Sequence, residues 1–156
     1  MTLATSTSED PVQTVIDLLD GTAEADWPGG TKPSSIEKQW ESDQRTKGNR
    51  SDPAAYVWSP DVGTQEPLST AGETKDQVET IAVDVWALDD TQADAIAGDV
   101  TSILEDYWHD KQANTTWDRI RPQSTDDRRA ETLARRSDHH VISVTVQLRR
   151  EDSIGT

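Results

Sequence analysis

Residues 81–90 read IAVDVWALDD, and this short stretch decides the fold. Its first seven residues alternate between the two faces of a strand. One face is aliphatic and consists of Ile81, Val83, Val85 and Ala87. The other face consists of Ala82, Asp84 and Trp86. Asp89 or Asp90 can then cap a helix, because a short carboxylate accepts hydrogen bonds from the free N–H groups of a first turn.

The residues that follow predict an amphipathic helix over 91–111. Apolar side chains recur at three- and four-residue steps and form one stripe. The stripe consists of Ala93, Ile96, Ala97, Val100, Ile103, Leu104, Tyr107 and Trp108. The opposite face carries Asp94, Asp99 and Asp106, which we expect to be solvated. We expect the apolar stripe to lie on a sheet.

Further elements are predicted on both sides of this strand and helix. Asp10 and Pro11 have the pattern of an N-cap and a first helical residue, with a short helix to about Asp20. Strands are predicted at 54–58, 78–88, 117–121 and 140–149. In the last of these, alternate residues face the core, namely Ile142, Val144, Val146 and Leu148. Residues 123–128 are expected to form a polar turn, and 131–136 favour a strand over a helical turn.

This order of elements predicts one α+β domain. We expect a mostly antiparallel sheet of four to five strands, with the long helix on one face and a short N-terminal helix. The domain is expected to span residues 10–150, with a flexible tail at 1–9 and a second tail at 151–156. Residues 59–77 lack periodicity between two strands, which predicts a long loop or hairpin arm.

The composition is strongly acidic. The chain has 30 Asp and Glu against 15 Lys and Arg, which gives a net charge of −15. Asp outnumbers Glu by 20 to 10 and Arg outnumbers Lys by 10 to 5, while large aliphatic residues are scarce. Molar salt shortens the Debye length to about 3 Å and screens the repulsion between carboxylates. The composition therefore favours an extreme halophile over an ordinary acidic protein with a tail.

The charge is distributed unevenly along the chain. Residues 1–110 contain 23 acidic and 6 basic residues, whereas 111–156 contain 7 acidic and 9 basic residues. Such a chain can dock onto copies of itself or onto acidic partners. The net charge argues against sequence-specific nucleic-acid binding. No cysteine, signal-peptide pattern or long apolar run is present, so we expect a soluble protein that is not exported by the usual route.

No pattern in the sequence predicts an enzyme or a cofactor. Asp138, His139 and His140 are candidates for a metal site, but adjacent strand residues point to opposite faces, so a turn before a strand is favoured. The pairs Asp89–Asp90 and Asp126–Asp127 could hold a cation or act as acid and base, but such pairs are expected by chance in so acidic a chain. Phosphate-binding loops and nucleophile motifs are missing from the sequence. We therefore predict no catalytic, cofactor or metal residues.

Candidate interface residues come mainly from arginine pairs, since arginine suits bidentate pairing with carboxylates at interfaces. The alternative is that these arginines form salt bridges to the acidic surface of their own chain, and the sequence favours neither interpretation over the other. The candidate interface residues are Arg128, Arg129, Arg135, Arg136, Trp86, Pro67 and Leu68. For Trp86, a place in the core is the simpler interpretation.

Three segments carry a family resemblance. They are ETIAVDVWALDDTQADAIAGDVTSILEDYW (79–108), TTWDRIRP (115–122) and HHVISVTVQLRR (139–150). In pattern and order they resemble the tail-terminator, or tail-completion, proteins of long-tailed double-stranded DNA viruses. The acidic composition points to a virus of haloarchaea. The resemblance covers about half of the chain, from residue 78 to 150.

The resemblance implies a virion structural protein made in the host cytoplasm. Such subunits form a ring, typically a hexamer, that ends the tail tube and joins it to the head connector. The implied partners are copies of the chain, the tail tube protein and a connector or stopper protein, and the family brings no catalytic residues. A connector or stopper of the same neck, a cellular halophilic ligand-binding domain and a metal-dependent hydrolase remain alternatives.

Overall fold

The computed structural model describes residues 3–38, 53–60, 64–67, 74–109, 115–127 and 140–153. The described strands are β1 (Ser35–Lys38), β2 (Ala54–Trp58), β3 (Thr64–Pro67), β4 (Thr74–Ala87), β5 (Arg119–Asp127) and β6 (His140–Ser153). They form one sheet in the order β1-β2-β4-β6-β5, and β3 pairs with the outer part of β4. Only β1 and β2 pair in parallel among these strands. The expected α+β fold with a mostly antiparallel sheet is therefore confirmed.

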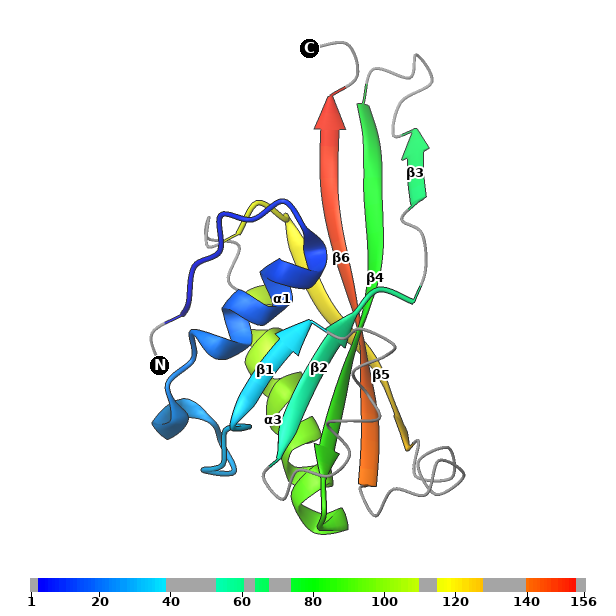
Figure 1. The fold of residues 1–156 in the computed structure, drawn as a ribbon. Helices are drawn as coiled ribbons and strands as arrows, with labels where there is room; N and C mark the ends of the chain where they lie inside the picture. Colours follow the sequence, from blue (N-terminus) through cyan, green and yellow to red (C-terminus); the bar gives the residue numbers. More distant parts are fainter. Residues whose placement is uncertain are drawn as a thin grey trace.

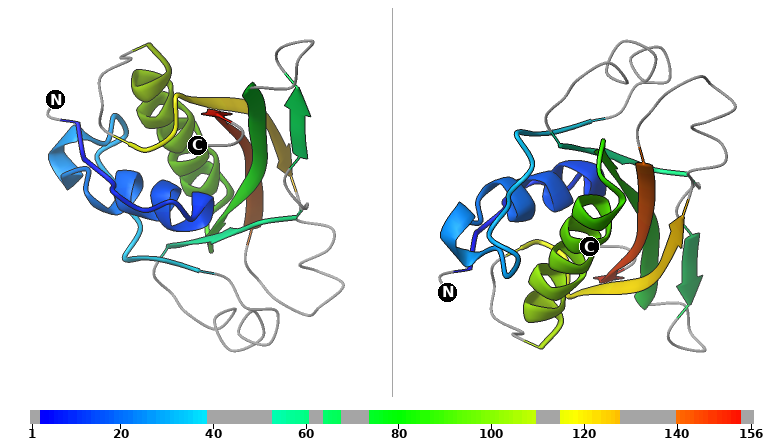
Figure 2. Two further views of the ribbon diagram at one scale, coloured as in Figure 1. Left: turned by 90° about the horizontal axis from the view of Figure 1, so that it is seen from above. Right: turned by 90° about the horizontal axis from the view of Figure 1, so that it is seen from below.

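Two α-helices cover one face of this sheet, as Figures 1 and 2 show. Helix α1 spans Pro11–Asp20 and helix α3 spans Asp90–His109, with a short 3-10 turn, η1, at Glu24–Asp26. Asp10 caps α1 by accepting a hydrogen bond from the N–H of Val12 at 3.0 Å. Asp89 accepts the corresponding bond from Thr91 at the start of α3, also at 3.0 Å. Both helix starts therefore lie where the sequence predicts them.

The main core lies between the helices and this sheet face. It joins the apolar stripe of α3 from Ala93 to Tyr107 with the buried side of α1, including Val15, Leu18 and Leu19, while the side chain of Trp108 lies outside the described residues. The predicted inward residues of β4 and β6 are all in this cluster: Ile81, Val83, Val85, Ala87, Ile142, Val144, Val146 and Leu148. Trp27 and Ile36 also belong to this core, although no helix or strand is predicted from the sequence around them. The prediction that the stripe of α3 seals against a sheet is confirmed.

Asp99 differs from expectation. The helical period places it on the solvated side of α3, but its side chain is only 6% exposed. Its two carboxylate oxygens accept hydrogen bonds from the N–H of Gly29 at 2.9 and 3.1 Å. The loop after η1 therefore packs over the helix, and this close approach leaves a Cβ on Gly29 only 2.8 Å from the Asp99 carboxylate. Contacts between segments this distant cannot be read from helical periodicity.

Strand β5 also differs from expectation. The predicted polar turn at 123–128 is wrong in its described part, because β5 continues to Asp127. Pro122 pairs with Val146 and Ser124 pairs with Thr145, so Gln123 is an extra residue in a bulge. Proline is tolerated in an edge strand and beside a bulge, because no ladder hydrogen bond is lost there. The candidate strand at 131–136 lies outside the described residues.

The chain start lies against the body. A flexible tail is expected at 1–9, and its described part, 3–9, makes several long-range contacts. Tyr107 accepts a hydrogen bond from the N–H of Ala4 at 2.8 Å, and the hydroxyl of Thr116 donates to the carbonyl of Ser8 at 2.8 Å. Ser6, only 4% exposed, donates to Asp17 at 2.8 Å. The segment thus connects α1, α3 and the approach to β5.

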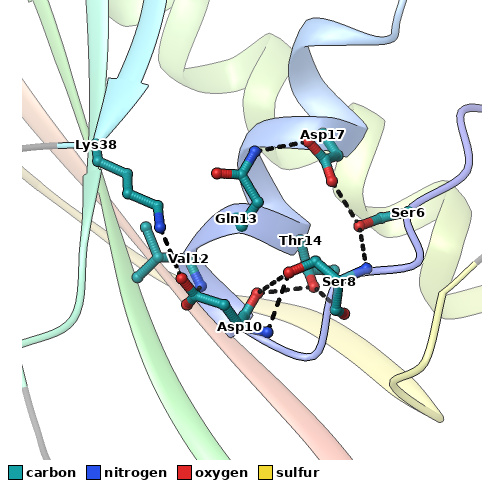
Figure 3. A network of polar contacts seen from close by, with 8 residues as sticks. All are labelled: Ser6, Ser8, Asp10, Val12, Gln13, Thr14, Asp17 and Lys38. Carbon is teal, nitrogen blue, oxygen red and sulfur yellow. Dashed lines mark hydrogen bonds and ion pairs between the residues drawn. The ribbon is translucent and has the colours of Figure 1, made fainter.

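Figure 3 shows the polar network at the start of α1. Lys38 of β1 donates a hydrogen bond to the carboxylate of Asp10 at 2.8 Å. Partial burial acts to raise the pKa of Asp10, but the bonds from Lys38 and from the N–H of Val12 outweigh it and lower this pKa below 3.8. Thr14 donates to the carbonyls of Ser8 and Asp10 at 3.1 and 3.0 Å. The network therefore fixes the chain start, α1 and β1 relative to one another.

Candidate interaction surfaces

The most prominent surface feature is an arm of paired strands. β4 and β6 each have 14 residues and pair along their whole length. At about 3.3 Å per residue, each strand is about 46 Å long. Their outer parts extend beyond the helices, with β3 beside them (Figure 1). We define the arm as β3, Thr74–Glu79 of β4 and Leu148–Ser153 of β6.

The arm agrees with one sequence prediction and modifies another. A loop or hairpin arm is predicted at 59–77, and β3 and the first residues of β4 occupy part of this range. β2 and β3 follow one another along the same edge of β4, because β2 pairs with Ala82–Trp86 and β3 with Lys75–Val78. Residues 151–153, predicted to be a tail, belong to β6. The arm therefore combines three separate segments of the chain.

Arg150 holds the base of the arm. Its guanidinium donates a hydrogen bond to the side chain of Gln77, its register partner on β4, at 2.8 Å. The same guanidinium lies 4.9 Å from the ring centroid of the buried Trp117, within the range of a cation–π contact. The N–H of Asp118 also donates to the carbonyl of Arg149 at 2.9 Å. These contacts attach both long strands to the segment that leads into β5.

The sheet face away from the helices has an apolar end. Its cluster consists of Ala54, Tyr56, Trp86 and Val141. The rings of Tyr56 and Trp86 meet edge to face, with centroids 6.1 Å apart and an interplanar angle of 78°. Beside them, Asp84 is only 1% exposed and accepts a hydrogen bond from the indole N–H of Trp58 at 3.0 Å. Trp86 itself is only 5% exposed, so it is buried within its own chain.

The other end of this face carries three arginines, which we call the arginine cluster: Arg119, Arg121 and Arg149. Arg119 is the register partner of Arg149, and Arg121 is the partner of Gln147. The residues between them, Ile120 and Leu148, point into the main core, so the arginines lie on the opposite side of the sheet. Arg119 and Arg121 are exposed, and Arg149 is half-buried. Asp126 lies further along β5 on the same face.

The outer face of α3 has the opposite charge. Asp94, Glu105 and Asp106 are exposed there. Between them lie four small exposed residues at helical spacing, Thr91, Ala95, Gly98 and Ser102. A Cβ built on Gly98 would meet no atom within 4 Å. We call this surface the acidic face of α3. Because α3 and the arginine cluster lie on opposite sides of the sheet, the two charged surfaces of one chain point away from each other.

The candidate interface residues from the sequence are only partly described. Arg128, Arg129, Arg135, Arg136 and Leu68 lie outside the described residues. Pro67 is the last residue of β3 and pairs with Lys75. The arginine cluster was missed, although the alternation of Arg119, Ile120 and Arg121 is visible in the sequence. The third member, Arg149, joins the cluster because β5 and β6 pair in a register that places it opposite Arg119. This register cannot be predicted from the alternation within either strand.

Among the candidate metal and acid–base residues that the structure describes, His140 and Asp90 lie close together. The imidazole Nδ1 of His140 lies 3.8 Å from the carboxylate of Asp90, while Asp138 and His139 lie outside the described residues. Within the described ranges, no three histidine, aspartate or glutamate side chains are grouped so that they could hold a metal ion. Burial raises the pKa of Tyr107, although the N–H of Ala4 partly offsets this. That hydroxyl binds the chain start, which is a structural contact.

The sequence matches no model of a known protein family and no curated protein at a significant level. Among the described residues, no helix combines the length and the apolar character needed to cross a bilayer.

Proposed function

We propose that the chain is a virion structural protein of the tail or neck of a long-tailed haloarchaeal virus. In this proposal, copies of the chain form a ring of six subunits, in keeping with the resemblance, that ends the tail tube and joins it to the head connector. The proposal combines the resemblance of residues 78–150 with the shape and charge of the described surfaces.

The observation that carries the proposal is the arm. A helix-covered sheet needs no such extension to bury its core, and the arm extends beyond both helices (Figure 1). β5 pairs with β6 only as far as Arg149, so Glu151–Ser153 lie at an edge of the described sheet. Backbone groups at a strand edge can pair with a strand from another chain. An arm of this kind can therefore join a subunit to its neighbour or to the tube.

The composition supports the proposed host. A net charge of −15 on 156 residues creates strong self-repulsion between subunits at low ionic strength. Molar salt reduces the range of this repulsion to about 3 Å, so that copies of the chain can come into contact. A ring of such subunits is then compatible with the salt concentration in a haloarchaeal cytoplasm.

Electron cryomicroscopy of the intact virus particle tests the proposal. We expect a ring of this chain between the end of the tail tube and the head. A ring in direct contact with the portal would instead favour the connector or stopper role. Absence of the chain from purified particles, checked by mass spectrometry, would contradict a virion role and favour a cellular ligand-binding domain.

A further inference from the structure

The described surfaces contain one pair of complementary charged regions that the resemblance does not assign. The arginine cluster lies on the sheet face away from the helices, and the acidic face of α3 lies on the helix side. We propose that the arginine cluster of one copy of the chain binds the acidic face of α3 on the next copy. This inference deepens the proposed ring, on which it rests, by naming the two surfaces that meet.

The charge distribution favours a second copy of the chain as the occupant. The protein has twice as many acidic as basic residues, yet Arg119, Arg121 and Arg149 lie together on two paired strands. Every copy of the chain also carries the exposed carboxylates of the acidic face of α3, which have the opposite charge. A second copy can therefore supply the complementary surface.

The shape of the acidic face of α3 suits this role. Asp94 and Glu105 lie three turns apart on one side of the helix, and Asp106 lies on the other side. The small side chains between them, at Ala95, Gly98 and Ser102, allow a sheet face to approach the helix closely. Guanidinium groups can then reach carboxylates on both sides and pair with them in a bidentate manner.

The placement of the two surfaces determines the symmetry of the contact. Because they lie on opposite sides of the sheet, each copy uses one surface to bind the copy before it and the other to bind the copy after it. This is a heterologous contact, which produces a closed ring when the rotation closes and a filament when it does not. At molar salt only charges in contact still interact strongly, so short arginine–carboxylate pairs suit this environment.

Sedimentation velocity in molar KCl tests the inference with neutralised variants. We expect R119Q/R121Q to raise the dissociation constant for self-association by roughly tenfold or more, because buried charge pairs at interfaces control dissociation. The matched control is K32Q/K38Q, which removes the same number of positive charges beside α1 and should change this constant by less than about twofold. Circular dichroism checks that both variants stay folded. Equal association of the two variants would overturn the inference.

A charge exchange gives a stronger test. The variants R119E/R121E and D94R/E105R should each fail to associate alone, because like charges then meet at every contact. Mixed together, the two should form assemblies in which they alternate, since both contacts again join opposite charges. Failure of the mixture to associate would contradict the proposed pairing of surfaces.

The outcomes also separate this inference from the proposed function. If the wild type forms a ring that R119Q/R121Q leaves unchanged, the surfaces are wrong and the ring remains. If the wild type stays monomeric at every protein concentration tested, copies of the chain do not bind one another through these surfaces unaided, and the inference fails. The neck assignment is then judged by imaging of the particle alone.

Discussion

The two faces of the sheet differ in how they are used. The helix-covered face is apolar along β2, β4, β6 and β5 and is buried by α1 and α3 of the same chain. The other face is divided, with the aromatic cluster of Tyr56 and Trp86 at one end and the arginine cluster at the other. The helix-covered face holds the chain together, whereas the divided face carries the exposed arginines that we propose bind another copy. Substitutions on the helix-covered face should therefore change the free energy of unfolding, whereas substitutions in the arginine cluster should change self-association.

The largest effect on stability is expected from the helix-covered face. Leu104 is fully buried in the main core, so Leu104→Ala should lower the free energy of unfolding by about 2–5 kcal/mol through lost burial and a residual cavity. Guanidinium denaturation at constant ionic strength measures this. Leu88, which is 45% exposed, provides the control, and Leu88→Ala should change stability by less than about 0.5 kcal/mol. Similar losses in both variants would contradict the described core.

A smaller effect is expected where the loop meets α3. Asp99→Ala removes the carboxylate that accepts from the N–H of Gly29 and leaves this donor without its described acceptor. Hydrogen bonds to charged groups contribute about 1.5–3 kcal/mol, and the better helix propensity of alanine offsets a few tenths. Asp94→Ala, on the exposed side of α3, is the matched control and should be nearly neutral. If Asp99→Ala left the free energy of unfolding unchanged, Asp99 would be a solvated residue, as the helical period predicts.

On the divided face, Trp86→Phe should lower stability by about 1 kcal/mol. The smaller ring weakens the edge-to-face contact with Tyr56, and aromatic pairs contribute about 0.5–1.5 kcal/mol beyond burial. Denaturation measured by circular dichroism tests this independently of the lost indole fluorescence. Self-association should be unchanged, because Trp86 is buried within its own chain. Reduced association without loss of stability would instead make Trp86 an interface residue.

The smallest effect concerns pH at the start of α1. The pKa of Asp10 is lowered in the folded state, so the ionised carboxylate stabilises the fold. This stabilisation is fully present above the ordinary pKa of 3.8 and is lost as the pH falls through the folded-state pKa. Asp10→Asn keeps a good N-cap but removes the charge. We expect a difference below about 0.5 kcal/mol near neutral pH, because the Lys38 pair is half-exposed and screened by salt. The difference should vanish in acid, and a difference that persists there would contradict the ionic origin.

The sequence predicts the parts of the fold that follow from local periodicity. The stripe of α3, the alternation of β4 and β6 and the caps at Asp10 and Asp89 all belong to this class. The errors arise where distant segments meet. Asp99 is buried by a loop around Gly29, and β5 continues through Pro122 because a bulge and an edge position accommodate it. The arginine cluster likewise depends on the register of β5 against β6, which cannot be deduced from either strand alone.

The strand order has a consequence for synthesis of the protein. β6 follows both β4 and β5 in the sequence but lies between them in the sheet, and the N–H of Ala4 binds the hydroxyl of Tyr107. The described sheet therefore cannot close on the ribosome until β6 has emerged. Pairings so distant in sequence form slowly, and until β6 arrives the unpaired edge of β4 is open to other nascent chains. A cell that makes this protein must therefore keep nascent chains apart from one another until β6 has been synthesised.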